Sequence, residues 1–272
     1  WDFYIPSSGE QNKIMTGGTI RLGDGLSSSN GSTNGFIITI PTTYGFPLGN
    51  IKINNPSGTN RFVKFTRSSG TNPININDIN IEAGTWTING ISFNVNGNIT
   101  NNGLMDVSTA SSAINMTGLT HQTISGTGSQ SVTNNLSFTV NNSTGVSFNC
   151  PFSCLKLNLT NGILTTDATN IITVLSSAPT DLTGGSSTSY INGPLQRNIS
   201  TVTNTYKFPI GKSSYTYLEL KNPTTSGNVM VRAEVFDADC GGSITNPAGY
   251  ELNSNRYWLA QVVSGTFTNA SV

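Results

Sequence analysis

The chain has 272 residues, of which 10% are charged and 35% hydrophobic, and its formal net charge is zero. A typical soluble protein carries about 25% charged residues, so neutral polar side chains must solvate most of this surface. A surface without net charge gives no electrostatic steering toward nucleic acid or anionic lipid. It also lacks the repulsion that keeps copies of a protein apart. The composition therefore argues against nucleic-acid binding and suits a chain that packs against copies of itself.

Short strand signals fill the first two thirds of the chain, and no long stretch has helical periodicity. Each run is rich in β-branched or alternating apolar residues and is closed by Asn, Gly or Ser, which is typical of a strand that ends in a turn. No apolar run approaches the length of about 18 residues that a membrane helix needs. These features predict a solenoid, barrel or sandwich with strands at 37–40, 51–53, 79–81, 91–95, 157–159 and 171–174.

Two blocks of sequence recur in the same order. Residues 51–58 resemble 138–145, and residues 79–87 resemble 157–165, with apolar positions and turn residues kept. Stacked copies of one supersecondary unit bury a continuous core between neighbours. We therefore predict a β-solenoid-like (parallel β-helix) region over 1–185, with two related units at about 36–90 and 115–174 that recur after about 80 residues.

The pattern changes after a Gly/Ser-rich joint at 184–189. The strands then lengthen, and residues 229–236 alternate regularly, which predicts a β-sandwich module over 186–272. The last residues, 265–272, read as the start of a strand. We expect this module to be incomplete at its C-terminal end, so that either further chain or a neighbouring molecule supplies a strand. Because the sequence begins at Trp1 without an initiator Met, it is interpreted as an excerpt of a longer or processed protein.

Side chains suited to catalysis are scarce and scattered. His121 is the only imidazole in the sequence, and a hydrolase triad needs such a group beside a serine and an acid. Asp237 and Asp239 are a weak calcium candidate, since a full calcium loop has more oxygen ligands and a closing Glu. We expect no catalytic residue, no resident metal and no cofactor.

The three cysteines do not form an even disulfide framework. Cys150 and Cys154 bracket Pro151, and a bend at the proline favours a disulfide between them in an oxidising compartment. Cys240 then has no partner in this sequence and is expected to pair elsewhere, if at all. The predicted bridge is Cys150 with Cys154.

Four aromatic residues are candidates for stacking on sugar rings: Trp86, Tyr215, Tyr217 and Trp258. At strand spacing such residues more often pack in a core or along a strand face. The sequence leaves both interpretations open.

Several Asn- and Gly-rich segments resemble a known family. Residues 97–103, 122–128 and 141–145 resemble the repeats of very large secreted surface proteins of the Bacteroidota, and 192–197 with 206–211 resemble the module that follows such repeats. Those proteins are exported by the type 9 secretion system and include gliding-motility and adhesin-like filaments. The resemblance implies an extracellular or cell-surface location and contact with the type 9 machinery, and it supplies no catalytic residues.

The sequence therefore predicts a non-enzymatic structural or adhesive segment of a large surface protein or filament. Its expected partners are copies of itself, other chains of a surface assembly and, as a further class, glycans. No nucleic-acid partner and no direct membrane span are expected. The alternative is a carbohydrate-binding or polysaccharide-cleaving β-helix protein.

Overall fold

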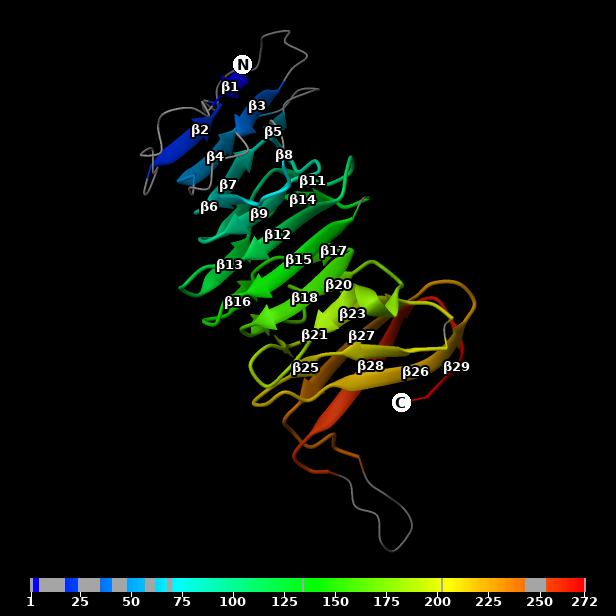
Figure 1. The fold of residues 1–272 in the computed structure, drawn as a ribbon. Helices are drawn as coiled ribbons and strands as arrows, with labels where there is room; N and C mark the ends of the chain where they lie inside the picture. The colour runs from blue at the N-terminus through cyan, green and yellow to red at the C-terminus, as the bar shows by residue number, and fades with distance from the viewer. Residues whose placement is uncertain are drawn as a thin grey trace, which may run out of the picture.

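The structure is a computed structural model that describes residues 2–4, 18–23, 35–40, 48–56, 62–67, 70–133, 135–201, 203–242 and 253–271. Across these residues the regular elements are strands, together with one 3-10 turn, η1 (Pro179–Asp181). Most strands stack in parallel, and the last ones pair antiparallel (Figure 1). The predicted all-β fold with a β-solenoid-like, parallel β-helix body is confirmed.

Three walls of parallel strands form this solenoid. Wall 1 contains β6 (Ile74–Ile76), β9 (Ser92–Val95), β12 (Ser112–Met116), β15 (Leu136–Asn141), β18 (Lys156–Asn161) and β21 (Leu182–Gly184). Wall 2 contains β2 (Thr19–Leu22), β4 (Asn50–Asn54), β7 (Ile79–Ala83), β10 (Ile99–Asn101), β13 (Gln122–Ser125), β16 (Val146–Phe148), β19 (Leu164–Thr165), β22 (Ile191–Asn192) and β25 (Ile210–Gly211). Wall 3 begins with β1 (Asp2–Tyr4), β3 (Phe36–Ile40), β5 (Phe62–Arg67), β8 (Thr85–Thr87), β11 (Leu104–Asp106) and β14 (Ser129–Ser131), and β17 (Phe152–Cys154), β20 (Ile172–Val174) and β23 (Leu195–Ile199) take its place in the later rungs.

One rung of the solenoid crosses walls 1, 2 and 3 in that order, as β6, β7 and β8 do. Along wall 1, successive rungs align in register through one column of partners whose residue numbers are 19 to 25 apart: Ile74, Phe93, Ile114, Phe138, Leu157 and Leu182. The structural repeat is therefore a single rung.

This repeat differs from the predicted recurrence after about 80 residues. The blocks at 51–58 and 79–87 contribute β4 and β7 to wall 2, whereas 138–145 and 157–165 contribute β15 and β18 to wall 1. In each copy the two blocks supply neighbouring strands of one wall. The sequence similarity thus reflects the strand-and-turn pattern that the rungs share. It does not mean that the similar blocks occupy equivalent positions in the solenoid.

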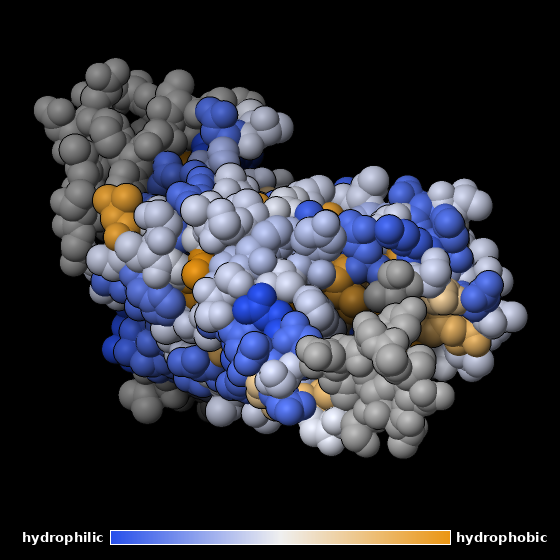
Figure 2. Space-filling view, turned by 90° about the horizontal axis from the view of Figure 1, so that it is seen from below, coloured by the Kyte–Doolittle hydropathy of each residue, from blue (hydrophilic) through white to orange (hydrophobic). Residues whose placement is uncertain are grey.

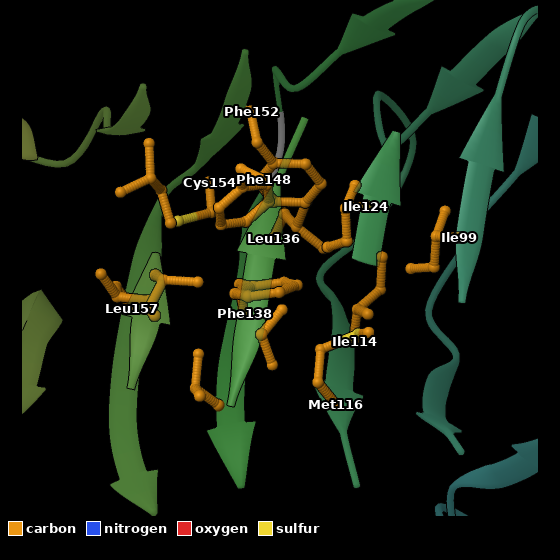
Figure 3. Packing of buried hydrophobic residues seen from close by; sticks show 14 of the residues in the cluster. Ile99, Ile114, Met116, Ile124, Leu136, Phe138, Phe148, Phe152, Cys154 and Leu157 are labelled. Carbon is orange, nitrogen blue, oxygen red and sulfur yellow. The ribbon is translucent and has the colours of Figure 1, made fainter. Parts of the chain in front are cut away.

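Alternation along each strand explains the core. In β15, Leu136, Phe138 and Val140 are buried, whereas the residues between them are partly exposed. The same pattern in every wall sends one apolar row inward, because successive side chains of a strand point to opposite faces. Figure 3 shows these side chains stacked between neighbouring rungs.

Aromatic rings from all three walls meet inside a single rung. The ring centroid of Phe138 in wall 1 lies 5.6 Å from that of Phe148 in wall 2 and 4.9 Å from that of Phe152 in wall 3. Phe148 and Phe152 are 5.0 Å apart. Such pairs contribute about 0.5–1.5 kcal/mol each beyond the burial of their area, so this triad (Figure 3) stabilises the middle of the solenoid.

A buried polar network supports the turns between walls. Gln122 and Asn142 are each 1% exposed, and the Asn142 amide donates to Gln122 Oε1 at 2.9 Å. The Gln122 amide donates to the Val95 carbonyl of the preceding rung at 2.9 Å. Because buried amides are costly when unpaired, this network fixes the stacking of three successive rungs.

A glycine is required at the turn after β18. Gly162 has φ +88°, and a Cβ there would collide with the carbonyl oxygen of Asn142 on the rung before. Glycine adopts this left-handed conformation without steric cost. The turn residue is thus set both by backbone conformation and by the closeness of the stacked rungs.

The parallel stack continues past the predicted boundary at residue 186. β22 pairs in parallel with β19 and with β25, so wall 2 extends to Gly211. β23 pairs in parallel with β20 on one side and antiparallel with β27 (Val229–Phe236) on the other. The solenoid and the C-terminal module therefore share β23.

The C-terminal module has two facing layers of antiparallel strands (Figure 1). One layer continues from β23 through β27 to β28 (Tyr257–Ser264). The other consists of β24 (Thr205–Phe208), β26 (Leu218–Thr225) and β29 (Phe267–Ser271). This arrangement matches the predicted sandwich, which starts as an extension of the last solenoid rungs.

Arg197 of β23 lies where the two parts join. Its side chain is fully buried, and its guanidinium donates to the Lys207 carbonyl at 2.8 Å and to the carbonyls of Ala178 and Pro179 at 3.3 Å. It also lies over the ring of Tyr206, 4.8 Å from the centroid. Burial lowers the pKa of Arg197 well below its usual value, to about 10. The buried guanidinium thereby links η1, β23 and β24.

Candidate functional site

The outward face of wall 1 carries a ladder of neutral hydrogen-bonded side chains. Asn94 donates to Asn75 at 2.9 Å, and Asn115 donates to Asn94 at 3.0 Å. Farther along, Asn158 accepts a hydrogen bond from Thr183 at 2.8 Å. These side chains satisfy much of one another's hydrogen-bonding capacity. Such a row of side chains resembles the polar ladders that stabilise stacked strands.

His121 lies on the solenoid surface and is bonded on both ring nitrogens. Nε2 is 2.8 Å from Ser147 Oγ, and Nδ1 is 2.9 Å from the Thr144 carbonyl oxygen. A carbonyl can only accept, so Nδ1 carries a proton, and in the neutral imidazole Nε2 then accepts from the serine. This serine–imidazole pair has no carboxylate in its hydrogen bonds and is solvent-exposed. It therefore lacks the acid and the enclosure of a hydrolase site.

Trp86 does not face solvent, so its candidacy for glycan stacking is wrong. The side chain is 0% exposed, and its ring packs edge-on against Phe93 with centroids 5.1 Å apart. The sequence Thr85–Trp86–Thr87 in β8 alternates, which sends the tryptophan inward. Trp86 is a core residue of the solenoid.

The expected disulfide between Cys150 and Cys154 is absent, because all three cysteines are free thiols. Cys154 alternates inward on β17 with Phe152 and is fully buried, and burial raises its pKa above the usual value. Cys150 is partly buried and packs its sulfur 3.8 Å from the Ile124 carbonyl oxygen. Burial also raises the pKa of the Cys150 thiol. Cys240 is exposed, and neither of the other two is in a disulfide with it.

Tyr215 and Tyr217 form an aromatic cluster beside the joint. Their ring centroids are 5.8 Å apart, and Tyr190 lies 6.1 Å from Tyr215. The Lys207 ammonium lies over both rings, 5.5 Å from the centroid of Tyr215 and 4.8 Å from that of Tyr217. Tyr217 is 50% exposed. This cluster is accessible, and sequence reasoning did not include its lysine because Lys207 lies on β24, before the segment that carries the two tyrosines.

At the calcium candidate, Asp237 forms an ion pair with an arginine of the same chain. Asp237 Oδ1 lies 2.6 Å from Arg256 Nε, and Asp237 Oδ2 accepts from the Ser213 hydroxyl and, at 3.0 Å, from the Ser213 amide. These bonds from Arg256 and Ser213 lower the pKa of Asp237 to about 2. Asp239 instead accepts from the Gly241 amide at 2.9 Å. With both oxygens of Asp237 engaged, the geometry does not favour a cation site.

The described ranges hold no further candidate metal site. They contain no group of three or more His, Cys, Asp or Glu side chains that could hold a metal ion. Among the same residues, no helix is long and apolar enough to cross a membrane.

Trp258 lies on β28, the outermost strand of its layer. It is 41% exposed, and Leu259, Val262 and Val263 of the same strand are 46–49% exposed. Figure 2 shows the end of the molecule seen from below, where hydrophobic surface is confined to patches among hydrophilic atoms. The structure thus places Trp258, Asp237 and the Tyr215–Tyr217 pair in the C-terminal module and leaves Trp86 in the solenoid.

Sequence reasoning missed the importance of this strand as a whole. Residues 257–264 contain no charged residue, no proline and no glycine. Natural edge strands usually carry such residues as protection against pairing. Their absence was the signal that marks β28 as unusual.

No protein-family model, no curated protein and no solved structure matches this chain.

Proposed function

We propose that this chain is a non-enzymatic structural or adhesive segment of an extracellular or cell-surface assembly. In this proposal the solenoid is a stiff spacer, and the C-terminal module makes contacts with other chains. At about 4.8 Å per stacked strand, the strands of wall 2 give a spacer of about 40 Å. The resemblance to secreted surface proteins of the Bacteroidota supports this location and makes the type 9 machinery the proposed export partner.

The observation that carries the proposal is the parallel ladder of wall 2, which runs from β2 to β25. A stacked ladder satisfies backbone groups from rung to rung and resists bending. Its polar outer faces are solvated without net charge, which allows close lateral packing. These are properties of a scaffold, and the scarcity of acid–base groups fits the same role.

The test is immunogold electron microscopy of intact cells that produce the protein, with antibodies raised against the purified chain. We expect label on the cell surface or on extracellular filaments. The control is the same serum after absorption with purified chain. Label confined to the cell interior would contradict the proposal.

A second candidate function is glycan binding by the exposed tyrosine cluster. Exposed aromatic rings stack on the apolar faces of sugars, and the Lys207 ammonium is available as a donor to hydroxyl groups. A glycan array should then show binding that Tyr217→Ala removes. Leu119→Ala, which changes a fully solvated leucine on the solenoid (92% exposed), is the matched control.

A polysaccharide-degradation assay with the same chain separates this candidate from the cleaving alternative. Binding without release of fragments supports a glycan-binding module. Release of fragments by the wild-type chain would contradict the non-enzymatic proposal.

A further inference from the structure

β28 is a long strand at the edge of its layer. It pairs with β27 on one side, and no described strand pairs with its other side. Seven of its eight residues are exposed. Its outer edge therefore presents a row of backbone N–H and C=O groups that another strand can use.

The register with β27 shows which face of β28 is uncovered. Val231 pairs with Val262, Ala233 with Ala260, and Val235 with Trp258. The three β27 residues are buried at 0–2% exposure in the core of the module, whereas their partners on β28 are exposed. Directly paired residues share one face of a sheet. The apolar inner face of the module thus extends onto β28 without cover.

The facing layer ends in the same way. β29 pairs only with β26 among the described strands, and four of its five residues are exposed. Phe267, the first residue of β29, is the one that packs against the core. The module is therefore closed on the side of the solenoid and open on the side of β28.

The residue types on β28 identify a second copy of this chain as a suitable occupant. An antiparallel two-fold pairing centred on Ala260 places Trp258 opposite Val262 on the inner face, and it places Tyr257 opposite Val263 on the outer face. No charged residue opposes another along the strand, because residues 257–264 carry none. Like charges directly opposite each other would destabilise such a pair.

The flanks of the strand are compatible with the same register. Arg256 falls opposite Ser264 of the other copy, and its charge is already compensated by Asp237 at 2.6 Å. The whole chain has zero net charge, so two copies experience no net long-range repulsion. A two-fold pairing uses the same strand of both copies and closes on itself.

We propose that two copies of this chain associate through antiparallel pairing of their β28 strands around Ala260, which joins their sheets into one and sets Trp258 of each copy beside Val262 of the other. This inference deepens the proposed function and rests on it for the view that the chain works by association.

The test measures the molar mass of the full chain by light scattering during size-exclusion chromatography. We expect the wild type to reach twice its monomer mass of 28.7 kDa as concentration rises. Ala260→Lys places two lysines against each other at the two-fold axis, and Ala260→Glu places two glutamates there. Each variant alone should remain at the monomer mass, and an equimolar mixture of the two should recover the dimer.

Two controls separate a specific result from a folding defect. Ala260 is exposed, so at concentrations where the wild type is monomeric both variants should keep its circular dichroism spectrum and its thermal midpoint. Leu119→Lys adds a charge at an exposed leucine of the solenoid and should dimerise as the wild type does.

Three outcomes overturn the inference. A wild-type chain that stays monomeric at every concentration refutes the second copy as occupant. Variants that dimerise alone show that another surface is used, and a mixture that stays monomeric shows that the two Ala260 positions do not meet. A monomeric chain that still labels the cell surface would overturn this pairing and leave the proposed function intact.

Discussion

The solenoid and the C-terminal module differ in how they treat their strand edges. In the middle of the solenoid, strands such as β12 and β15 have a parallel partner on both sides. Their apolar residues, among them Ile114 and Phe138, are 0% exposed. In the module, β28 and β29 each pair on one side only within the described chain, and Trp258 is 41% exposed.

The difference supports the proposed division of tasks between the two parts. Stacked rungs satisfy their backbone groups through the next rung, so a solenoid leaves few groups for binding along its length. An open antiparallel layer keeps both backbone groups and apolar side chains available. The solenoid is therefore suited to provide rigidity, and the module is suited to provide contacts.

Truncation of Phe138 should give the largest loss of stability. Phe138→Ala removes the wall 1 member of the aromatic triad and leaves a cavity, which costs about 3–5 kcal/mol for a fully buried phenylalanine. Urea unfolding followed by circular dichroism measures this change. The matched variant Trp258→Ala removes a larger ring from β28 and should cost below about 1 kcal/mol at concentrations where the chain is monomeric. Equal losses for the two variants would break the comparison.

Arg197 tests the connection between the two parts. Arg197→Ala leaves the carbonyls of Lys207, Ala178 and Pro179 without this donor and should cost about 3 kcal/mol, since unpaired buried acceptors are expensive. Arg232→Ala on the more exposed face of β27 is the control and should cost below about 1 kcal/mol. Unfolding monitored by tyrosine fluorescence is the measurement. A small effect of Arg197→Ala would mean that the junction does not depend on this guanidinium.

The buried network of the turns should give an intermediate effect. Asn142→Ala removes the donor to Gln122 Oε1 and to the Thr120 carbonyl, at a cost of about 2 kcal/mol. The neighbouring Asn141 is exposed, so Asn141→Ala should be close to neutral. Chemical denaturation measures the free energy of unfolding of both variants. Similar losses for the two variants would mean that the buried network does not stabilise the rungs.

The smallest expected effect is the loss of stability of the C-terminal module in acid. Asp237 has its pKa lowered to about 2 by Arg256 and Ser213, so its contribution to stability is fully present above its unfolded pKa, usually about 3.9, and is lost as pH falls through about 2. A carbon-13 NMR titration of the Asp237 carboxyl group should show this low midpoint. Arg256→Ala should move the midpoint upward. A midpoint already at the ordinary value in the wild type would contradict the described contact.

The sequence predicts where the strands lie along the chain much better than it predicts which wall each strand joins. Alternation predicts that Leu136, Phe138 and Val140 share a buried face, and the structure confirms it. Sequence similarity between 51–58 and 138–145 cannot distinguish wall 2 from wall 1, because every rung uses the same apolar strand followed by an Asn or Gly turn. The wall is decided by long-range pairing, such as that of Ile51 with Ile79.

The candidate residues show the same limit. Trp86 stands between two threonines, so alternation already pointed to a buried position, and only its size made it a glycan candidate. The Tyr215–Tyr217 pair was visible in the sequence, but its lysine comes from β24 and the partner of Asp237 from residue 256. Contacts between distant segments depend on the register in which the strands pair. The local sequence pattern does not reveal that register.

Hydrogen exchange at low and high protein concentration tests the division between rigid scaffold and associating module most directly. The account predicts that amides of the buried solenoid strands, such as β12 and β15, are strongly protected at both concentrations. Amides of residues 257–264 should exchange readily when dilute and become protected when concentrated. Protection of β28 that does not change with concentration, or concentration-dependent protection confined to the solenoid walls, would contradict the account.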